Sequence, residues 1–401
     1  MANTLVPQDA YALINAISAQ ALGASSIAAV DTTTFVSVGE TLLSSSLDNT
    51  LNAISCMIAK TIFAARPYKA KLSSLERGEE RFGAITRKIT YLHKDAEPSN
   101  DYNTQVSGYT TQLADGNSID MYKINAPKAM QFNFPGLQIL QRHITRFRNQ
   151  LAVALQSEQE LLNFWEGAMV EFYNLLEEDK EERSRSVLFN YIAGKNAMSN
   201  GVVDLVAEFN TRYSTTYTRA QLLSTYLPDF MKFVAARIKV YSSLLTERSV
   251  NYHASITGYD KIVRHTPKER QKMIMYNPIF IEAESQVYSS LFNPQYLEIG
   301  DFEGINYWQS AAAPAEIICK PNILNVSNGQ STDGTSQTME FVLGILYDEE
   351  ALGVMTKFDY SGSTPFNVAG GYSNLYYHAS FKSYADYTEN AIVFILGAGG
   401  V

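Results

Sequence analysis

The side chains that could carry out chemistry in this sequence are scattered, and none of them has the spacing of a known catalytic or metal-binding motif. The carboxylates Glu177, Glu178, Glu181 and Glu182 form a charge run, which usually marks a solvated helix face. No two of the five His residues are four positions apart, the spacing that presents a pair to one metal ion from a helix. We therefore expect packing or surface roles for His93, His143, His253, His265 and His378.

Two glycine-containing segments match phosphate-binding loops only in part. Gly194-Lys195 is the Gly-Lys pair of a P-loop, but Phe189 stands where the first Gly is needed and Asn196 where Ser or Thr is needed. The segment 397–400 follows a predicted strand, as a dinucleotide-binding turn would. The sequence ends at Val401, before a helix could supply its N-terminal dipole. We therefore expect no enzyme, no cofactor and no metal site.

The composition indicates a folded, acidic protein with extensive contact surfaces. The 401 residues include 32 Lys and Arg against 41 Asp and Glu, and 46% are hydrophobic. The formal net charge of −9 argues against tight nucleic-acid binding through overall charge, because phosphate contacts need Lys and Arg. The 25 Tyr favour surfaces that are half apolar and half wet.

The cysteines and the N-terminal segment indicate the cellular compartment in which the protein is made. Cys56 and Cys319 belong to no CxxC pattern, which argues against a disulfide scaffold and a structural zinc site. Lys60 is the first basic residue, so the sequence has no basic region typical of a signal peptide. We expect a soluble protein made in a reducing cytoplasm.

The first part of the chain is predicted to be ordered by contacts with the rest of this chain or with a neighbouring one. Residues 31–50 are rich in Ser and Thr, so we expect little core there and expect the segment to lie along this chain or a neighbour. Within and after it, a three- and four-residue spacing predicts an amphipathic helix that ends before Pro67, with the stripe Leu43, Leu47, Leu51, Ile54 and Ile58.

Residues 68–130 combine dense charge, short alternating runs and many turn residues. Their apolar content is too low to bury a sheet on both faces, which predicts an extended hairpin that projects from the body. Such a hairpin gains order by lying on another subunit. The alternative interpretation is a disordered surface insertion. If the hairpin is correct, deleting 68–130 abolishes assembly and leaves a folded body.

The remaining elements predict the α+β class, because helices and strands come in blocks. The strongest helical periodicity covers 145–182, and a second helical region covers 218–246 with a break or a new first turn at Pro228. A further helix is predicted for 278–292. Strands are predicted at 272–276, 316–320, 339–347, 372–381 and 391–396.

The order of these parts resembles a known family. The stretches that carry the likeness are 35–91, 161–188, 271–294, and 344–359 together with 375–396. They are similar to the arm helix and extended loop, the spine helix, the apical strand and helix, and the closing strands of major capsid proteins of tailed double-stranded DNA phages. These proteins have the Hong Kong 97-type capsid fold, and the likeness is greatest to the short-tailed phages of the phi-29 kind.

The resemblance implies a division of the chain. The implied parts are an N-terminal arm (1–66), an extended β-hairpin loop (67–130), a peripheral domain with the spine helix (131–200), an apical domain with connecting peripheral segments (201–365) and C-terminal peripheral strands (366–401).

The resemblance also implies a structural protein of the virion. It would self-assemble in the host bacterial cytoplasm, as pentamers and hexamers, into an icosahedral or elongated shell around double-stranded DNA. The implied partners are other copies of the chain, a scaffolding protein and a portal, without a membrane. Two alternatives remain open here, namely an encapsulin-like compartment shell and an enzyme with a dispersed active site. The candidate inter-subunit contacts are Arg77, Glu79, Glu80, Arg81, Arg87 and Lys88.

Overall fold

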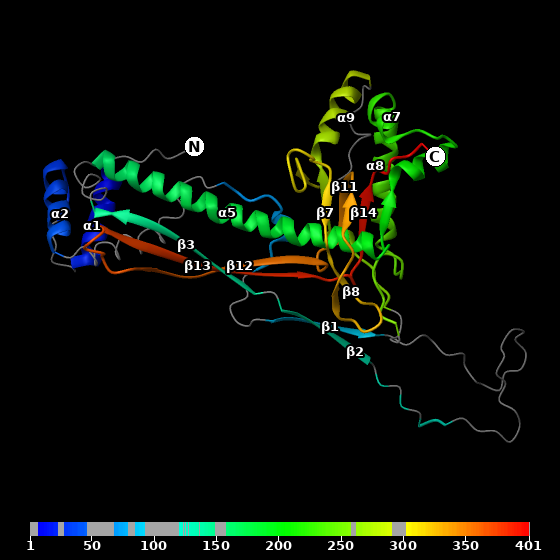
Figure 1. Cartoon of the computed structure of the whole chain (residues 1–401), viewed down its shortest axis with the longest axis horizontal. Helices are drawn as coiled ribbons and strands as arrows, with labels where there is room; N and C mark the ends of the chain where they lie inside the picture. Colours follow the sequence, from blue (N-terminus) through cyan, green and yellow to red (C-terminus); the bar gives the residue numbers. More distant parts are fainter. Residues whose placement is uncertain are drawn as a thin grey trace, which may run out of the picture. The chain divides into compact units, whose positions relative to one another are not determined.

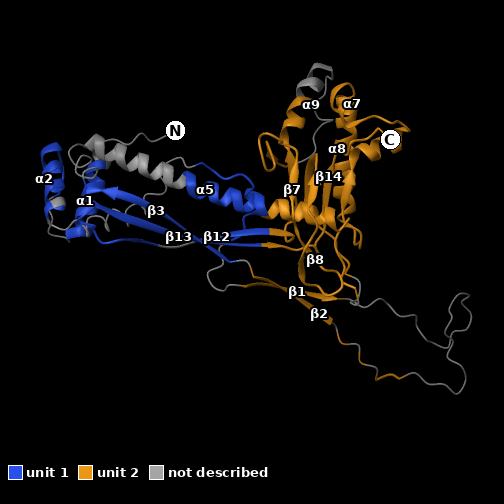
Figure 2. Cartoon of the chain, viewed as in Figure 1, with its two compact units in different colours: residues 1–84, 136–186, 353–383 blue, residues 85–135, 187–352, 384–401 orange. Residues whose placement is uncertain are grey.

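The computed structural model of the chain describes most of its helices and strands (Figure 1). The described residues are 7–22, 28–45, 68–78, 85–92, 120–122, 124, 126, 128–135, 137–148, 158–257, 262–290 and 302–400. The predicted helical stripe beyond residue 45 and the middle of the predicted loop, 93–119, lie outside these residues. The chain divides into two compact units (Figure 2). Unit 1 comprises 1–84, 136–186 and 353–383, and unit 2 comprises 85–135, 187–352 and 384–401.

Unit 1 contains a three-stranded sheet and most of a long helix, α5 (Glu158–Ala197). The sheet has the order β12 (Leu352–Ser363), β13 (Tyr372–Ala385), β3 (Gln138–Phe147). Strands β13 and β3 pair antiparallel from Tyr372↔Phe147 to Phe381↔Gln138. Arg142 on β3 forms a two-pronged ion pair with Asp179 on α5, through Nε–Oδ2 and Nη2–Oδ1 contacts of 2.6 Å each. This pair fixes the helix against the sheet, because a planar guanidinium binds a carboxylate in one geometry.

Two N-terminal helices in unit 1 form a small core of their own. Helices α1 (Pro7–Leu22) and α2 (Thr32–Ser45) bury Ile14, Phe35 and Leu42 completely, and the rings of Tyr11 and Phe35 meet edge to face at 6.2 Å. The start of α2 is stabilised by the Asp31 carboxylate, which accepts a 2.7 Å hydrogen bond from the Thr34 backbone amide. The expectation of little core in residues 31–50 is therefore wrong for α2. Its Phe35, Val38 and Leu42 share one helix face and are buried, although Ser and Thr make up much of the rest of the helix.

Unit 2 is built on a five-stranded sheet with the order β4-β14-β11-β5-β6. Its central strand, β11, is buried at every residue. The strands are β4 (Val202–Asp204), β14 (Ala391–Ile395), β11 (Val342–Asp348), β5 (Gln271–Tyr276) and β6 (Glu303–Ile305). The helices beside α5 are α6 (Leu205–Tyr213), α7 (Arg219–Ser224), α8 (Leu227–Leu244) and α9 (Asn277–Ser290). Smaller ladders join β10 (Gln337–Met339) to β7 (Ile317–Cys319) and β8 (Asn322–Leu324) to β9 (Ser331–Asp333).

Most predicted elements of unit 2 are confirmed. Strands occupy 271–276 and 391–395, a helix begins at Asn277, and Pro228 lies in the first turn of α8. The predicted strand 339–347 is wrong at its start, because β10 ends at Met339 and β11 begins at Val342. In that gap the Phe341 carbonyl accepts from the Leu396 amide at 3.0 Å, so the chain changes partner there.

The long helix is confirmed, but its predicted bounds are shifted. Helix α5 begins at Glu158, whereas residues 145–147 continue strand β3. Those residues pair with β13, so strand pairing overrides the helical period that begins there. At the other end the helix continues to Ala197 because Leu188, Tyr191 and Ile192 extend its buried face. No helix in the described part of the chain is both long and apolar enough to cross a membrane.

Gly344 lies in β11 where the pairing of this strand with β14 shifts its register, between Val342 and Gly344. A Cβ at this position would meet Met275 Sδ and would lie 2.6 Å from the Ile274 carbonyl oxygen. We expect Gly344→Ala to lower the free energy of unfolding by about 1–3 kcal/mol, as overpacked cores do. Chemical denaturation measures this loss. The matched control is Gly362→Ala on β12, where a Cβ has nothing within 4 Å, and an equal loss in both variants would contradict the prediction.

Candidate functional site at the base of the hairpin

Two strands from the predicted loop form an antiparallel ladder in unit 2. Strand β1 (Ile85–Leu92) pairs with β2 (Lys128–Pro135) from Ile85↔Pro135 to Leu92↔Lys128. The antiparallel pairing of the predicted hairpin is confirmed, but its two described strands pack on the body of unit 2 where the sequence predicted a projection, and β2 continues beyond the predicted limit at residue 130. Because side chains alternate along a strand, the ribbon has an inner face on the body of unit 2 and an outer face.

The inner face packs on the body of unit 2. Leu92 of β1 and Met130 of β2 are buried in one apolar cluster with Ile256 and Ile262, and Phe132 packs against this cluster. At the far end of β2, the ring of Phe134 lies 5.7 Å from that of Tyr384. The hairpin base is therefore an integral part of unit 2.

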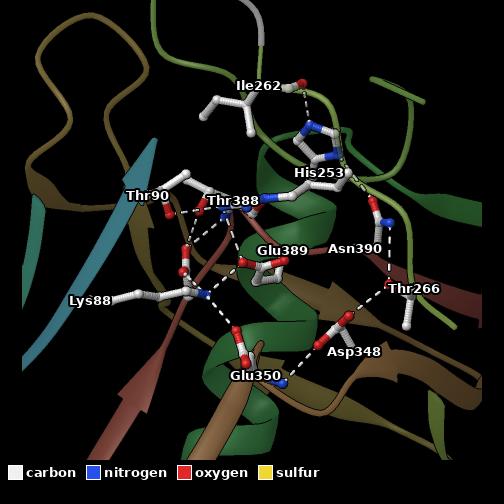
Figure 3. A network of polar contacts seen from close by, with 12 residues as sticks. Lys88, Thr90, His253, Ile262, Thr266, Asp348, Glu350, Thr388, Glu389 and Asn390 are labelled. Atoms are coloured by element: carbon white, nitrogen blue, oxygen red, sulfur yellow. Dashed lines mark hydrogen bonds and ion pairs between the residues drawn. The ribbon is translucent and has the colours of Figure 1, made fainter. Parts of the chain in front are cut away.

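Lys88 is the charged centre of the inner face (Figure 3). Its Nζ atom lies 2.7 Å from Asp386 Oδ2 and 2.6 Å from Glu389 Oε1, and both carboxylate side chains are more than nine-tenths buried. Arg264 completes the cluster with an Nη2 contact of 3.1 Å to the same Glu389 oxygen. It also donates to Thr90 Oγ1 on β1 at 3.1 Å. Two cations thus neutralise the two buried carboxylates beneath the hairpin, and the half-exposed Glu350 forms a longer ion pair of 3.9 Å with Lys88.

Burial and neighbouring charges shift the pKa values of this cluster in opposite directions. Burial acts to lower the pKa of Lys88, but the adjacent charges of Asp386 and Glu389 outweigh it and raise that pKa above the ordinary value. Burial raises the pKa of Glu389, although Lys88 and Arg264 act to lower it. The cation is therefore firmly held, whereas Glu389 takes a proton more readily than an exposed glutamate does.

The turn 386–390 between β13 and β14 supplies most partners of the cluster. All five of its residues are buried. Asp386 Oδ1 accepts hydrogen bonds from the amide and the hydroxyl of Thr388, at 2.8 and 2.7 Å. The Tyr387 ring stacks on Tyr191 of α5 at 4.9 Å. The turn therefore joins the hairpin to α5 and to the central sheet.

The candidate inter-subunit residues fall in different places. Glu79, Glu80 and Arg81 lie outside the described residues. The Arg77 amide donates to the Val354 carbonyl at 2.9 Å within unit 1, and Arg87 is exposed on the outer face of β1. Lys88 pairs within its own chain, as described above. The inter-subunit role of the six residues stays a prediction.

Sequence reasoning missed the acidic half of the cluster. Asp386 and Glu389 are 298 and 301 positions from Lys88, and no motif or spacing in the sequence connects them to it. The signal that could have found them is a run of polar residues directly before a fully apolar strand. Among the described residues, no group of three or more His, Cys, Asp or Glu is placed to hold a metal ion.

The combination of a long helix, a three-stranded sheet, a two-stranded hairpin and a unit on a five-stranded sheet is that of phage capsid proteins with the Hong Kong 97-type fold. The capsid structure of Staphylococcus phage Andhra is similar, with a TM-score of 0.53 at 10% identity over 83% of this chain and 85% of that chain. The structure described as "head fiber and inner core protein gp22 of native bacteriophage P68" is also similar, with a TM-score of 0.52 at 9% identity over 83% of this chain and 86% of that chain.

The family is shown by the sequence itself. Residues 14–395 match the model of the Phi29-like phage major capsid protein family, and the chain belongs to this family. A search of curated proteins found no match. The protein is therefore a structural component of the phage virion that assembles with other copies into the capsid. The encapsulin-like and enzyme alternatives receive no support from these comparisons.

Proposed function

We propose that the chain builds its shell from pentamers and hexamers around double-stranded DNA, and that the outer face of the hairpin lies on a neighbouring copy. The observation that carries the proposal is the exposure of Ile85, Ile89 and Tyr91, which are 56%, 53% and 67% accessible on one side of β1. The opposite side already packs on unit 2. A two-stranded ribbon with apolar side chains on both faces gains stability when the second face is covered.

The rest of the proposal follows the division of the chain given by the resemblance. The apical segment 201–365 converges at the centre of a capsomer, and the arm 1–66 reaches along another copy. The parts 131–200 and 366–401 form the peripheral body between them. Many modest contacts of this kind give a stable closed shell, because each copy is held by several neighbours at once.

The remaining partners fit the charge of the chain. A net charge of −9 suits a container, because an interior that bound phosphate strongly would resist packaging and release of DNA. Assembly takes place in the host bacterial cytoplasm, with a scaffolding protein and a portal. Arg77 and Arg87, together with the acidic residues near them, form contacts between subunits.

The test removes the part of the loop beyond the paired strands. Leu92 and Lys128 face each other at the end of the ladder, so an Asn-Gly turn can replace 93–127 and close the hairpin. We expect a folded chain that no longer forms closed shells in negative-stain images, whereas the wild type forms them. Normal shells from this variant would refute the role of the loop.

The wider deletion of 68–130 is a less suitable test of the loop's role in assembly than the sequence indicated. It would remove Lys88, Leu92 and Met130, and would leave Asp386 and Glu389 without the lysine. The expectation that such a deletion leaves a folded body therefore conflicts with the burial of these partners.

A further inference from the structure

The carboxylates at 177–182 on α5 do not form the uniform solvated face that the sequence predicted. Glu178 and Glu182 are exposed, but Glu181 is only 7% exposed, and the side chain of Glu177 is 19% exposed. The two less exposed carboxylates are four positions apart, so they share one face of the helix. This face lies within unit 1 (Figure 2) and meets a segment from the N-terminal part of the chain.

The upstream half of this face binds the start of a segment that runs beside the helix. Asn174 Oδ1 accepts a hydrogen bond from the Tyr68 amide at 2.8 Å. About one turn further along α5, Glu177 Oε2 accepts a hydrogen bond from the Ala70 amide at 2.9 Å. Both donors are backbone groups, so this half of the face binds the chain by its backbone and not by particular side chains.

Glu181 binds the same segment through two further hydrogen bonds. Its Oε2 atom accepts from the Lys71 amide at 3.2 Å and from the Tyr68 hydroxyl at 2.8 Å. Arg185 contacts the other oxygen through Nε at 2.9 Å and Nη2 at 2.7 Å. Burial acts to raise the pKa of Glu181, but the hydrogen bonds that it accepts, first from Tyr68 and then from Arg185, outweigh burial and lower that pKa below the ordinary value. The carboxylate is therefore ionised at neutral pH, and a charged acceptor forms the stronger hydrogen bond.

The residue after the bound segment has a strained backbone. Leu72 has a φ of 70° and a ψ of 35°, in the left-handed region that a bulky residue rarely occupies. Its side chain and that of Leu75 are completely buried, so packing holds the chain in this turn. Beyond the turn, the Arg77 amide donates to the Val354 carbonyl on β12 at 2.9 Å. The chain is thus bound to the helix, bent, and then bound to the sheet.

The bound segment lies at the junction of two parts of the chain. It begins two residues after the proposed arm, 1–66, and lies at the start of the proposed loop, 67–130. We propose that Asn174, Glu177 and Glu181 form a clasp that fixes the start of the loop on α5 and so preorganises the loop for its contact with a neighbouring copy. The role in assembly rests on the proposed function. A loop that is anchored beforehand loses less conformational freedom when it binds, which favours association.

Hydrogen–deuterium exchange of the unassembled chain at neutral pH tests the clasp. Glu177→Gln keeps an oxygen acceptor for the Ala70 amide but removes its charge, and a charged acceptor roughly doubles the strength of such a hydrogen bond. Exchange of the Ala70 amide is expected to rise by roughly fivefold to tenfold. The matched control is Glu178→Gln, the same substitution at the adjacent exposed position, which is expected to leave this exchange unchanged. An equal rise in both variants would overturn the clasp.

Tyr68→Phe tests whether the hydrogen bonds act as one unit. It removes the hydroxyl that donates to Glu181, and the ring is 46% exposed, so the ion pairs of α5 stay in place. The Ala70 amide is bound by Glu177 and is not touched by this change. If the clasp opens as a unit, exchange of the Ala70 amide nevertheless rises. An unchanged exchange rate at Ala70 would show separate, independent hydrogen bonds and would overturn the clasp.

The role in assembly requires a variant with an open clasp. We combine Tyr68→Phe with Asn174→Ala and Glu177→Ala, which removes three of the four hydrogen bonds that α5 accepts from the segment. Exchange at 68–71 is expected to approach that of an unfolded chain, while exchange along α5 stays low. The protein concentration at which shells appear is expected to rise by roughly tenfold or more, because ordering even one free residue costs about that factor.

The outcomes separate the clasp from the proposed function. A raised threshold in the open-clasp variant, with wild-type assembly of its control Glu178→Ala with Glu182→Ala, supports the positioning role. If the open-clasp variant assembles like wild type while replacement of 93–127 prevents shells, the positioning role is wrong and the proposed function stands. If replacement of 93–127 leaves normal shells, the proposed function fails and the positioning role fails with it.

Discussion

Lys88→Met is expected to lower the free energy of unfolding of unit 2 by about 3–5 kcal/mol at neutral pH, the usual cost of leaving a buried charge without its partner. The variant keeps much of the side-chain volume and removes the ammonium group that contacts Asp386 and Glu389. Arg264 remains for Glu389 alone. Denaturation followed through the fluorescence of the fully buried Trp308 reports on unit 2, in a Trp165→Phe background.

The control is the adjacent Arg87→Met on the exposed face of β1, which is expected to change stability by no more than about 0.5 kcal/mol. Acidification provides a second check. Without Lys88 the buried carboxylates bind protons more tightly in the folded chain than in the unfolded chain, so the deficit of Lys88→Met shrinks as the pH falls. A loss equal to that of Arg87→Met, or a deficit that grows in acid, would contradict the cluster's role.

The second large effect concerns assembly. Replacing Ile85, Ile89 and Tyr91 together with Thr is expected to abolish closed shells and leave the isolated chain folded. These side chains are more than half exposed, so each substitution is expected to change stability by no more than about 0.5 kcal/mol, and Thr retains the preference for a strand. At a contact between copies, each side chain would contribute roughly 1 kcal/mol, and the loss is repeated at every equivalent contact of a shell.

Sedimentation and negative-stain imaging measure this effect. The control is Ile318→Thr on β7, a residue as exposed as Ile89, at 53%. Normal shells from the triple variant, or the same assembly defect in Ile318→Thr, would contradict the assignment of the outer face. Thermal unfolding of the unassembled triple variant separates loss of contacts from loss of fold.

Local patterns predicted much of unit 2. The apolar runs at 272–276 and 391–396 are long enough to be buried strands, and Asn277-Pro278 predicts a helix start whatever surrounds it. The core between the two N-terminal helices could not be predicted from local sequence patterns. Ser and Thr dominate residues 31–45, and the core that Phe35 shares with α1 depends on contacts between helices.

The sequence by itself determined the α+β class, the order of elements and the family resemblance, because these follow from periodicity and turn residues that act over a few positions. Tertiary structure alone decided which face of the hairpin meets the body. Alternation along 85–92 predicts two faces but assigns neither, and the choice is made by Asp386 and Glu389, about 300 positions away. The same holds for His253, whose burial, acceptors and neighbouring charges come from four separate parts of the chain. Electrostatics and packing act through space, so the chemistry of these side chains exists only after the chain has folded.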